Sequence, residues 1–428
     1  MLKHVVSLVA FTSLLAGLAT AVDQKPAKQK DSSPAGPVEV HVTEDLIPRQ
    51  QPRSDDWPMY GYDAGNTFCN RGEKTLAAPL VKAWDVALEG HLESVVVSSG
   101  IVLAAAGTDQ KHKVFALDAR NGRRLWTFIL PGGGGGGIGM SPACSGDLVF
   151  FGGQNDKSVY AADLRTGALR WKHDEIKSMY DASPKVADGV LYINSTQSGL
   201  WAFDAKTGKE KWRDRAPGWQ ADIAIKAGKL LRPGGAYGGA LIAFDSASGE
   251  QSWRHGERST SFRLAATDNL TFVPYAGEKP VEITEGKDFK RFKYDRIAAF
   301  GTRDGKKIWE TVLKEDAYYS GLLVAGDSLY VATRGGSVYC LDTKTGKIRK
   351  EVPFKQGWGS LIGTNEVIFA SSKKEIVALA PNTLEALWTT RMVGFPLMAV
   401  ANGRLYVAAE SRIVAFANVK RDGKEKPD

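Results

Sequence analysis

A thirteen-residue pattern of the form V-x-A-x-D-x-x-T-G-x-x-x-W recurs along most of this chain. Its four clearest copies span residues 114–126, 159–171, 200–212 and 241–253. In each copy the Asp precedes the Gly by four residues and the Gly precedes the Trp by four. These positions hold Asp118, Gly122, Trp126, Asp163, Gly167, Trp171, Asp204, Gly208, Trp212, Asp245, Gly249 and Trp253. A fixed period of this kind predicts a repeat architecture.

Three later copies are partly eroded but keep the spacing. Residues 297–309 keep Trp309 with Gly301 in the Asp position, residues 338–350 keep Asp342 and Gly346 but end in Lys350, and residues 376–388 keep Trp388 alone. With a last position at residue 417, the Asp positions number eight and lie 37 to 56 residues apart. Eight positions predict eight structural units.

Within each unit, apolar residues alternate with a period of two in short runs bounded by Gly, Asn, Asp and Ser. The runs at residues 189–194 and 200–204 show this clearly. Such runs indicate strands, whereas paired-helix repeats of similar length need apolar residues spaced three and four apart. The sequence therefore predicts an all-β fold, an eight-bladed β-propeller of four-stranded antiparallel blades.

The eighth unit lacks an outer, Trp-bearing strand before the chain ends. A strand with that pattern, residues 80–84, stands unassigned at the other end, and its Trp84 precedes Trp126 by 42 residues, one full repeat. We expect this N-terminal strand to complete the last blade, which would close the ring and remove open sheet edges that would otherwise favour aggregation.

The remaining segments define the expected domain boundaries. Residues 1–21 have Lys3, an apolar run and the small-residue pattern Ala19-Thr20-Ala21, which is typical of a secretory signal peptide; an uncleaved membrane anchor is the alternative. Residues 22–56, rich in Lys, Pro, Gln and Ser, predict a flexible linker. The propeller is expected over 57–418, with a charged tail at 419–428. We expect export to the periplasm or the extracellular space, with no stable membrane anchor after cleavage.

Composition excludes several functions. The net charge of +8 is spread over turns and tails rather than clustered, so nucleic-acid binding is not expected.

The six histidines show no metal-ligand spacing, and no nucleophile elbow or zinc-protease motif occurs. The run 132–137 consists of glycines without the Lys that follows in phosphate loops, so it predicts a connection between blades. Cys69, Cys144 and Cys340 predict no particular disulfide pair.

The repeats resemble the PQQ-like, or quinoprotein-type, β-propeller family from about Trp57 to Asn418. The A-x-D-x-x-T-G-x-x-x-W phrase is that family's blade signature, and residues 57–63 with Asn66 and Thr67 resemble the segment that leads into such propellers. The resemblance implies one of two activities. One branch contains dehydrogenases that carry pyrroloquinoline quinone with calcium; the other lacks the cofactor and acts as a protein-binding scaffold, as does the propeller subunit of the outer-membrane β-barrel assembly machinery.

The dehydrogenase branch typically carries two adjacent cysteines over the quinone, and some members add a C-x-x-C-H haem site. This chain has neither. The scaffold subunit of the assembly machinery carries a lipid-bearing cysteine directly after its signal, whereas the first cysteine here is Cys69. The chain is therefore expected to be a relative of the scaffold branch, with its membership in that machinery left open.

A second regularity lies just before each innermost strand, where aromatic residues gather. These positions hold His91, Tyr180, Trp219, Phe262, Tyr318, Tyr319, Trp358 and Phe395. Connections from an outer strand to the next inner strand share one face of a propeller, so these side chains predict an aromatic collar that could bind a peptide or a sugar. Wedging of the same rings between blades is the structural alternative.

The 56-residue interval contains an extra, densely charged loop near residues 276–295. It would project from the fifth blade on the same face as the collar, either as a recognition loop or as a solvated excursion.

These observations predict an exported, non-enzymatic scaffold that binds an extended peptide or protein partner through the aromatic-lined mouth of the ring. No cofactor and no metal is predicted. The alternative is a PQQ- and calcium-dependent quinoprotein dehydrogenase, and a third reading is a carbohydrate-binding propeller, which no carboxylate pair supports.

Overall fold

The structure is a computed structural model and describes residues 38–43, 46–108, 111–131, 141–152, 157–176, 183–216, 221–235, 239–261, 263–285, 289–318, 320–333, 335–354, 360–394 and 396–419. All of them belong to one compact unit, Gly36–Asp428. The expected signal peptide and the tail after residue 419 lie outside the described residues.

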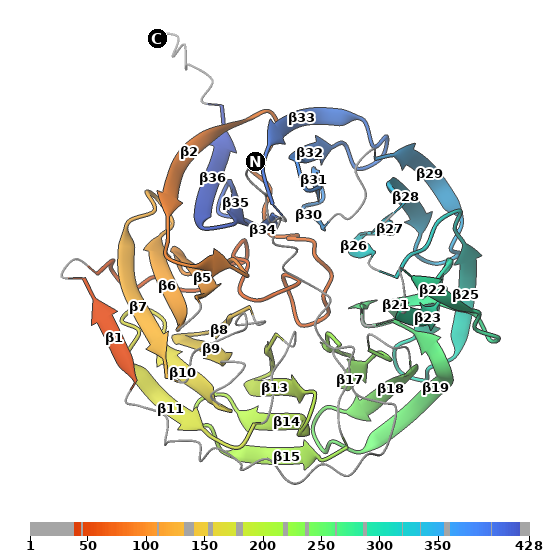
Figure 1. The fold of residues 1–428 in the computed structure, drawn as a ribbon, viewed down its shortest axis with the longest axis horizontal. Helices are drawn as coiled ribbons and strands as arrows, with labels where there is room; N and C mark the ends of the chain where they lie inside the picture. The colour runs from red at the N-terminus through yellow and green to blue at the C-terminus, as the bar shows by residue number, and fades with distance from the viewer. Residues whose placement is uncertain are drawn as a thin grey trace, which may run out of the picture. The chain divides into compact units, whose positions relative to one another are not determined.

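The predicted all-β, eight-bladed propeller is confirmed (Figure 1). Each blade is an antiparallel sheet of four strands that follow one another from the ring centre outward. The first four blades are β4 (Val96–Ser98), β5 (Ile101–Gly107), β6 (His112–Asp118) and β7 (Arg124–Leu130); β8 (Ala143–Ser145), β9 (Leu148–Gly152), β10 (Val159–Asp163) and β11 (Leu169–His173); β12 (Lys185–Ala187), β13 (Val190–Ser195), β14 (Gly199–Asp204) and β15 (Glu210–Asp214); and β16 (Ala224–Lys226), β17 (Lys229–Arg232), β18 (Gly239–Asp245) and β19 (Gln251–Thr260).

The last four blades repeat this order. They are β20 (Ala265–Ala266), β21 (Leu270–Tyr275), β24 (Arg296–Gly301) and β25 (Lys307–Val312); β26 (Gly321–Ala325), β27 (Ser328–Ala332), β28 (Ser337–Asp342) and β29 (Ile348–Pro353); β30 (Leu361–Gly363), β31 (Ile368–Ser371), β32 (Glu375–Leu379) and β33 (Ala386–Arg391); and β34 (Leu397–Ala401), β35 (Arg404–Ala409), β36 (Arg412–Asn418) and β2 (Leu80–Ala87).

The ring closes as predicted, because the N-terminal strand β2 is the outer strand of blade 8. It pairs antiparallel with β36 from Leu80 opposite Asn418 to Ala87 opposite Arg412. The N-terminal and C-terminal parts of the described chain thus contribute strands to one sheet, in which β2 covers the outer edge of β36.

The linker region differs from its expected flexible state over residues 39–42. These residues form β1 (Glu39–Val42), which pairs antiparallel with β7 as a fifth, outermost strand of blade 1. Val40 packs against the main core cluster and Ile47, a few residues on, is 2% exposed. The segment is therefore held because it covers an open sheet edge and buries apolar side chains, which its polar average composition conceals.

The tryptophans of the repeat join neighbouring blades. Trp126 of blade 1 donates from its indole nitrogen to the Leu164 carbonyl of blade 2 at 3.0 Å, and the same bond recurs from Trp84, Trp171, Trp212, Trp253 and Trp309 to the next blade. The indole also lies directly on a turn glycine of that blade. A Cβ on Gly167, at φ +71°, would stand 2.8 Å from the Trp126 ring. The glycine is required both by the turn and by the ring above it.

The aspartates of the repeat hold these same turns together. The Asp163 carboxylate accepts hydrogen bonds from the Arg165 and Thr166 amides at 3.1 and 2.9 Å, and Asp342 accepts equivalent bonds. Hydrogen bonds, led by those of Thr345, lower the pKa of Asp342 to about 2. The repeat residues therefore have a structural role in every blade that retains them.

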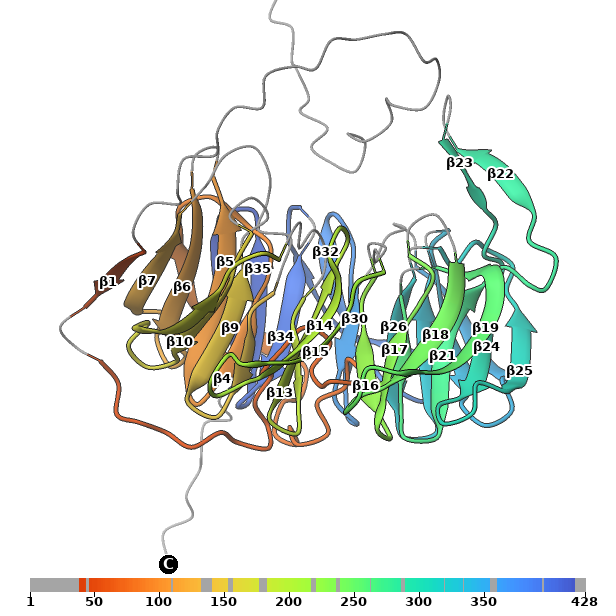
Figure 2. The ribbon, with the colours of Figure 1, turned by 90° about the horizontal axis from the view of Figure 1, so that it is seen from below.

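Blade 5 carries the extra segment. Between β21 and β24 the chain forms a two-stranded hairpin of β22 (Glu282–Glu285) and β23 (Phe289–Phe292), which stands out from the ring in Figure 2. The sheets of blades 4 and 5 are also continuous here, because Thr260 at the end of β19 pairs with Tyr275 of β21. No helix suited to crossing a membrane occurs among the described residues.

Candidate functional site

One segment before the ring, residues 57–70, crosses the ring centre and is here called the plug (Figure 1). Its backbone forms hydrogen bonds with the innermost strands near their C-terminal ends. For example, the amides of Ile225 and Ala266 donate to the carbonyls of Ala64 and Gly65, each at 2.7 Å. The plug therefore lies at the face where each innermost strand ends, which we call the plugged face.

The plug contacts all eight blades. In blade order, its partners are Val97, Cys144, Lys185, Ile225, Ala266, Val324, Gly363 and Val400. In blade 3 the bond comes from the Lys185 ammonium group, and in blade 8 the Val400 carbonyl accepts from the Asn70 side chain at 2.7 Å. No other described segment touches every blade in this way.

The opposite face, called here the mouth face, carries the remaining connections. Every link from an outer strand to the next innermost strand begins and ends there, as does every link from a second to a third strand, including the β22–β23 hairpin. Figure 2 shows the hairpin and the plug on opposite sides of the ring. A partner approaching the ring centre is therefore obstructed on one face by the chain's own backbone.

A cluster of buried polar groups fastens the plug beside the ring closure. The Asp56 carboxylate, 3% exposed, accepts from the Ser99 amide of blade 1 at 2.9 Å and from the Asn402 side chain of blade 8 at 3.2 Å. Asn70 and Glu73 extend the cluster, and Glu73 accepts from the Gly403 amide at 2.6 Å. These bonds link blades 1 and 8 independently of β2.

The plug follows a tight path. Tyr62, Asn66 and Phe68 adopt φ values of 73°, 55° and 54°, a region that non-glycine residues enter at a cost. The conformational cost at Asn66 is offset by a hydrogen bond, because its side-chain nitrogen donates to the Ile223 carbonyl at 3.0 Å. Tyr62 stacks obliquely against Trp57, with ring centroids 5.4 Å apart.

On its mouth side, the plug presents Tyr60 to two basic side chains. Lys185 of blade 3 donates to the Tyr60 carbonyl and to Asn66 Oδ1, with its ammonium nitrogen 5.3 Å from the Tyr60 ring centre. Arg263 of blade 5 donates to the Tyr60 hydroxyl and to Asp222 Oδ2, the latter at 2.9 Å. Burial lowers the pKa of Lys185 to about 8, although Asp222 and Asp63 oppose that change, and burial also lowers the pKa of Arg263.

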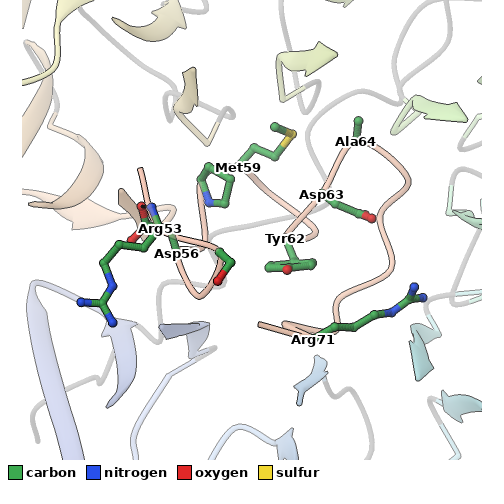
Figure 3. A pocket seen from close by; sticks show the side chains of 9 residues that line it. Arg53, Asp56, Met59, Tyr62, Asp63, Ala64 and Arg71 are labelled. Carbon is green, nitrogen blue, oxygen red and sulfur yellow. Dashed lines mark hydrogen bonds between the residues drawn. The ribbon is translucent and has the colours of Figure 1, made fainter. Parts of the chain in front are cut away.

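The plug borders an open hollow of about 370 Å³ lined by residues between 53 and 71. Figure 3 shows Tyr62 at its centre between Asp56 and Asp63, with the side chains of Arg53 and Arg71 extending away from it. Asp63 is already paired with Lys226 at 3.1 Å and Arg53 with Asp55 at 2.8 Å. The charged groups of the hollow do not converge on a common point.

The hairpin on the mouth face is held at its root by buried side chains. Arg291 is 6% exposed, donates to Asp316 at 2.8 Å and lies 4.6 Å from the centre of the Tyr318 ring. Tyr318 stacks on Tyr294 with ring centroids 5.4 Å apart. The strand residues Glu282 and Lys290 form an exposed ion pair of 3.4 Å above this root.

The structure describes two of the eight collar residues. His91 is exposed and begins the short strand β3 (His91–Leu92), whereas Tyr318 is 2% exposed and packs under the hairpin. Tyr180, Trp219, Phe262, Tyr319, Trp358 and Phe395 lie outside the described residues. The collar stays a prediction, with Tyr318 placed as a support of the hairpin root.

Sequence reasoning missed the plug and the basic pair that meets Tyr60. The sequence identifies residues 57–63 only as a segment that leads into the ring, and neither Lys185 nor Arg263 belongs to a motif. The available signal was the run of Gly, Asn and Asp around residues 61–66, which predicts turns, joined to aromatic residues that need burial.

The three cysteines are buried thiols, and none pairs with another. Burial raises the pKa of Cys69 to about 12 and also raises the pKa of Cys144. Across the described ranges, no three His, Cys, Asp or Glu side chains come together as a potential metal site.

The sequence of this chain is similar to those of known proteins. Residues 81–174, 155–283 and 293–426 match the family described as outer membrane protein assembly factor BamB. Two curated proteins are also similar: 1-butanol dehydrogenase (quinone) of Thauera butanivorans, 32% identical over 111 residues, and quinoprotein ethanol dehydrogenase of Pseudomonas aeruginosa, 33% identical over 131 residues. The matches cover 22% and 26% of this chain but only 16% and 19% of the two dehydrogenases.

Solved structures share the ring. A quinohemoprotein alcohol dehydrogenase of Pseudomonas putida superposes with a TM-score of 0.62 at 14% identity, covering 88% of this chain and 82% of that one. BamB of Moraxella catarrhalis superposes with a TM-score of 0.60 at 15% identity, covering 79% of this chain and 100% of that one. At such identities the likeness establishes the fold and no more.

Proposed function

Because the chain belongs to the PQQ-like β-propeller repeat family described as outer membrane protein assembly factor BamB, we propose that it is a non-enzymatic scaffold which binds an extended peptide or protein partner through its mouth face. The observation that supports this most strongly is the plug. Since the chain's own backbone occupies the ring centre at the other face, a partner that engages the centre has to approach from the mouth.

The β22–β23 hairpin supports the same face. At its root, buried Arg291 pairs with partly exposed Asp316, and its two strands have unpaired outer edges in a two-stranded sheet. Rigid elements that carry exposed backbone edges are suited to binding an extended partner segment by strand addition. The collar residues, as far as they gather on this face, would add aromatic contacts.

We propose that the protein is exported to the periplasm or the extracellular space. The sequence of residues 1–21 supports this, as does a family description that names an outer membrane assembly factor. A fusion of residues 1–21 to a reporter enzyme active only outside the cytoplasm would test export directly.

Site-specific photo-crosslinking in the host cell tests the mouth as a binding face. A photoreactive residue replaces Thr284, which is exposed on β22, and in a matched variant replaces Lys209, which is exposed in a turn of the plugged face. We expect a discrete protein adduct from position 284 and none from position 209. Adducts from position 209 alone would contradict the proposal, because they would place the partner on the plugged face.

The curated relatives favour a PQQ- and calcium-dependent dehydrogenase as the second candidate. Two observations count against that centre. The chain has no adjacent cysteines, and within the described ranges no three His, Cys, Asp or Glu side chains come together as a potential metal site. We therefore derive no catalytic step through the quinone.

A titration of the purified protein with pyrroloquinoline quinone and calcium, followed by tryptophan fluorescence and dye-linked alcohol oxidation, separates the two candidates. We expect no saturable fluorescence change and no turnover. Calcium-dependent binding with alcohol oxidation would replace the scaffold proposal with the dehydrogenase.

A further inference from the structure

The outer strands of the eight blades share two positions at their outer edge. One directly precedes the tryptophan of the repeat, or the residue in its place, and the other follows it by three. Charged residues and prolines at such positions protect an edge strand from pairing with another chain. In six blades, one or both positions hold a polar residue, a proline or a small residue. These pairs are Arg170 and Asp174, Lys211 and Arg215, Ser252 and Gly256, Arg349 and Pro353, Leu387 and Arg391, and Ala83 and Ala87.

Blades 1 and 5 alone carry branched aliphatic residues at both positions. On β7 these are Leu125 and Ile129, and on β25 they are Ile308 and Val312. The strand pairing agrees as well, because both outer strands pair with the third strand of their blade through a bulge directly before the tryptophan. The two edges therefore match in sequence and in geometry.

A fifth strand covers this edge in blade 1. β1 pairs antiparallel with β7 and sets Glu39 opposite Ile129. The Thr43 amide, directly after β1, donates to the Leu125 carbonyl at 2.9 Å. Leu125 is 0% exposed and Ile129 is partly buried. Blade 1 thus shows how the molecule covers an edge of this kind.

The matching edge of blade 5 is open. Ile308 is 53% exposed and Val312 is 59% exposed, and among the described strands only β24 pairs with β25. The Leu313 amide donates to the Asp295 carbonyl at 2.7 Å, on the side of β24. Because backbone groups alternate in direction along a strand, the amide of Val312 points outward. β25 therefore presents outward backbone groups between two exposed apolar side chains.

This edge adjoins the β22–β23 hairpin. The bond between Leu313 and Asp295 joins the end of β25 to the residues that lead from β23 into β24, and β25 lies beside the hairpin in both Figure 1 and Figure 2. β25 runs toward the mouth face, so an antiparallel segment on its edge starts at the mouth face and follows the rim of blade 5. A partner held by the hairpin is therefore able to continue onto β25.

We propose that the outer edge of β25 binds an extended segment of a partner protein as a fifth, antiparallel strand of blade 5. Backbone hydrogen bonds hold the segment, and its apolar side chains cover Ile308 and Val312. β1 supplies the pattern of such a segment, in which valines alternate with polar residues. The partner is the one proposed above and rests on that proposal, whereas the edge itself does not.

Glu310 favours a foreign segment over a second copy of this chain. If two copies paired through β25 with Ile308 opposite Val312, Glu310 would face the same residue of the second copy. Glu310 binds Arg296 and Lys307 at 2.7 and 2.8 Å, and a second carboxylate would compete for these cations. We therefore expect the segment to place an uncharged or basic residue opposite Glu310.

A labelled peptide with the sequence of residues 38–43, VEVHVT, is the probe. In the register of β1 its histidine lies opposite Glu310, as His41 lies opposite Thr127 on β7. Fluorescence anisotropy measures its binding to the full protein, and hydrogen exchange with mass spectrometry locates it. We expect saturable binding and slower exchange over residues 307–312. Replacing the histidine of the peptide with glutamate should weaken binding at least threefold, and replacing it with lysine should not weaken it.

Two variants give β25 the residues that β29 has at the same positions. Ile308→Arg copies Arg349. Val312→Pro copies Pro353 and removes an outward amide without breaking the pairing with β24. Each variant should weaken peptide binding tenfold or more. Leu387→Arg is the matched control and should leave binding unchanged, because Leu387 is 46% exposed at the equivalent position of β33 but has no second aliphatic residue beside it.

Melting temperature and far-UV circular dichroism establish that the variants are folded, and Val312→Lys replaces Val312→Pro if the latter is not. Absent binding, or unchanged binding in the folded variants, would overturn the inference. So would slower exchange in β7, which would mean that the peptide displaces β1, or slower exchange in β22 or β23 instead of β25. A dimer of the wild-type protein in ultracentrifugation that Val312→Pro abolishes would assign the edge to a second copy and overturn the foreign partner.

The outcomes separate this inference from the scaffold proposal. A partner crosslinked from position 284 together with absent peptide binding would leave the scaffold function standing and remove the β25 edge as a binding site. Peptide binding at β25 with no crosslinked partner would uphold the edge and remove the scaffold.

Discussion

At the scale of single residues, the repeat signature records contacts between blades rather than chemistry. Gly167 is a glycine for two reasons, its φ of +71° and the Trp126 ring 2.8 Å from where a Cβ would stand. Gly146, in another turn of the same blade, has φ +56° and nothing within 4 Å of that position. The two glycines therefore separate the conformational requirement from the packing requirement.

Gly167→Ala should destabilise the protein by about 3 kcal/mol, since the new methyl group displaces a buried indole in addition to straining the turn. Gly146→Ala should cost only about 1 kcal/mol, the conformational part. Urea unfolding measured by fluorescence gives both values. Equal losses would mean that the Trp126 contact adds nothing.

The buried Lys185 should make stability depend on pH in an unusual direction. Its pKa is lowered from 10.5 to about 8 in the folded protein, so between these values the unfolded chain binds more protons than the folded one. Stability therefore rises with pH through this window, and the cost of burying the cation is fully present below about pH 8.

Comparison with Lys185→Met isolates this effect from other titrating groups. Between pH 7 and pH 9.5, the free energy of unfolding of the wild type should rise by about 2 kcal/mol relative to the variant. Denaturant unfolding of both proteins at the two pH values provides the measurement. A constant difference would show that the lysine has an ordinary pKa.

At the scale of elements, six of the junctions between blades contain a matched pair, a tryptophan on one blade and a turn glycine on the next. The pair is lost together between blades 6 and 7. Lys350 replaces the tryptophan, and Leu384 replaces the glycine, where it packs with Tyr330 and Cys340 of blade 6 at φ +56°. We infer that the leucine side chain fills, from blade 7, the space that the indole fills at the other junctions from the preceding blade.

This substitution predicts a coupled response. Lys350→Trp alone should destabilise by about 1 kcal/mol, because Leu384 occupies the indole site, and Leu384→Gly alone should cost about 3 kcal/mol through lost packing. The double variant should recover at least about 1 kcal/mol relative to the sum. Additive effects in the double-mutant cycle would refute the matched-pair description.

At the scale of the whole molecule, we expect the plug to make the ring unfold as a single cooperative unit. It touches all eight innermost strands, and its cluster at Asp56 links the first and last blades. Asn70 is central to this arrangement. It is fully buried, donates to the Val400, Asp55 and Asp56 carbonyls, and accepts from the Gly72 and Glu73 amides.

Asn70→Ala should lower the free energy of unfolding by about 3 kcal/mol, since several buried groups lose their partners at once. Asn121→Ala is the control, because that exposed asparagine accepts one turn amide, and it should cost less than about 1 kcal/mol. Both proteins should unfold in one transition by fluorescence and by circular dichroism. A separate early transition in Asn70→Ala would indicate that the plug does not unite the blades.

The ring was predictable from the repeat because most blades contain the same turn and outer-strand residues at the same spacing. Trp84, one repeat before Trp126, was sufficient to predict how the ring closes. The plug was not predictable in the same way, since residues 57–70 occur once and their partners are spread over the entire chain. Neither Lys185 nor Arg263 belongs to a sequence motif. The two residues meet Tyr60 only because the folded ring brings blades 3 and 5 to the plug.

The two ends of the described chain leave the ring from opposite faces. Glu39 lies opposite Ile129, at the end of β7 that leads to the mouth, whereas Asn418 lies opposite Leu80 on the plugged side. A tether attached ahead of Glu39 would therefore join the ring at its mouth face. A tether attached after Asn418 would join it at the plugged face. Immobilised by its C-terminus, the ring would turn its mouth face to the solution; immobilised by its N-terminus, it would turn that face to the support.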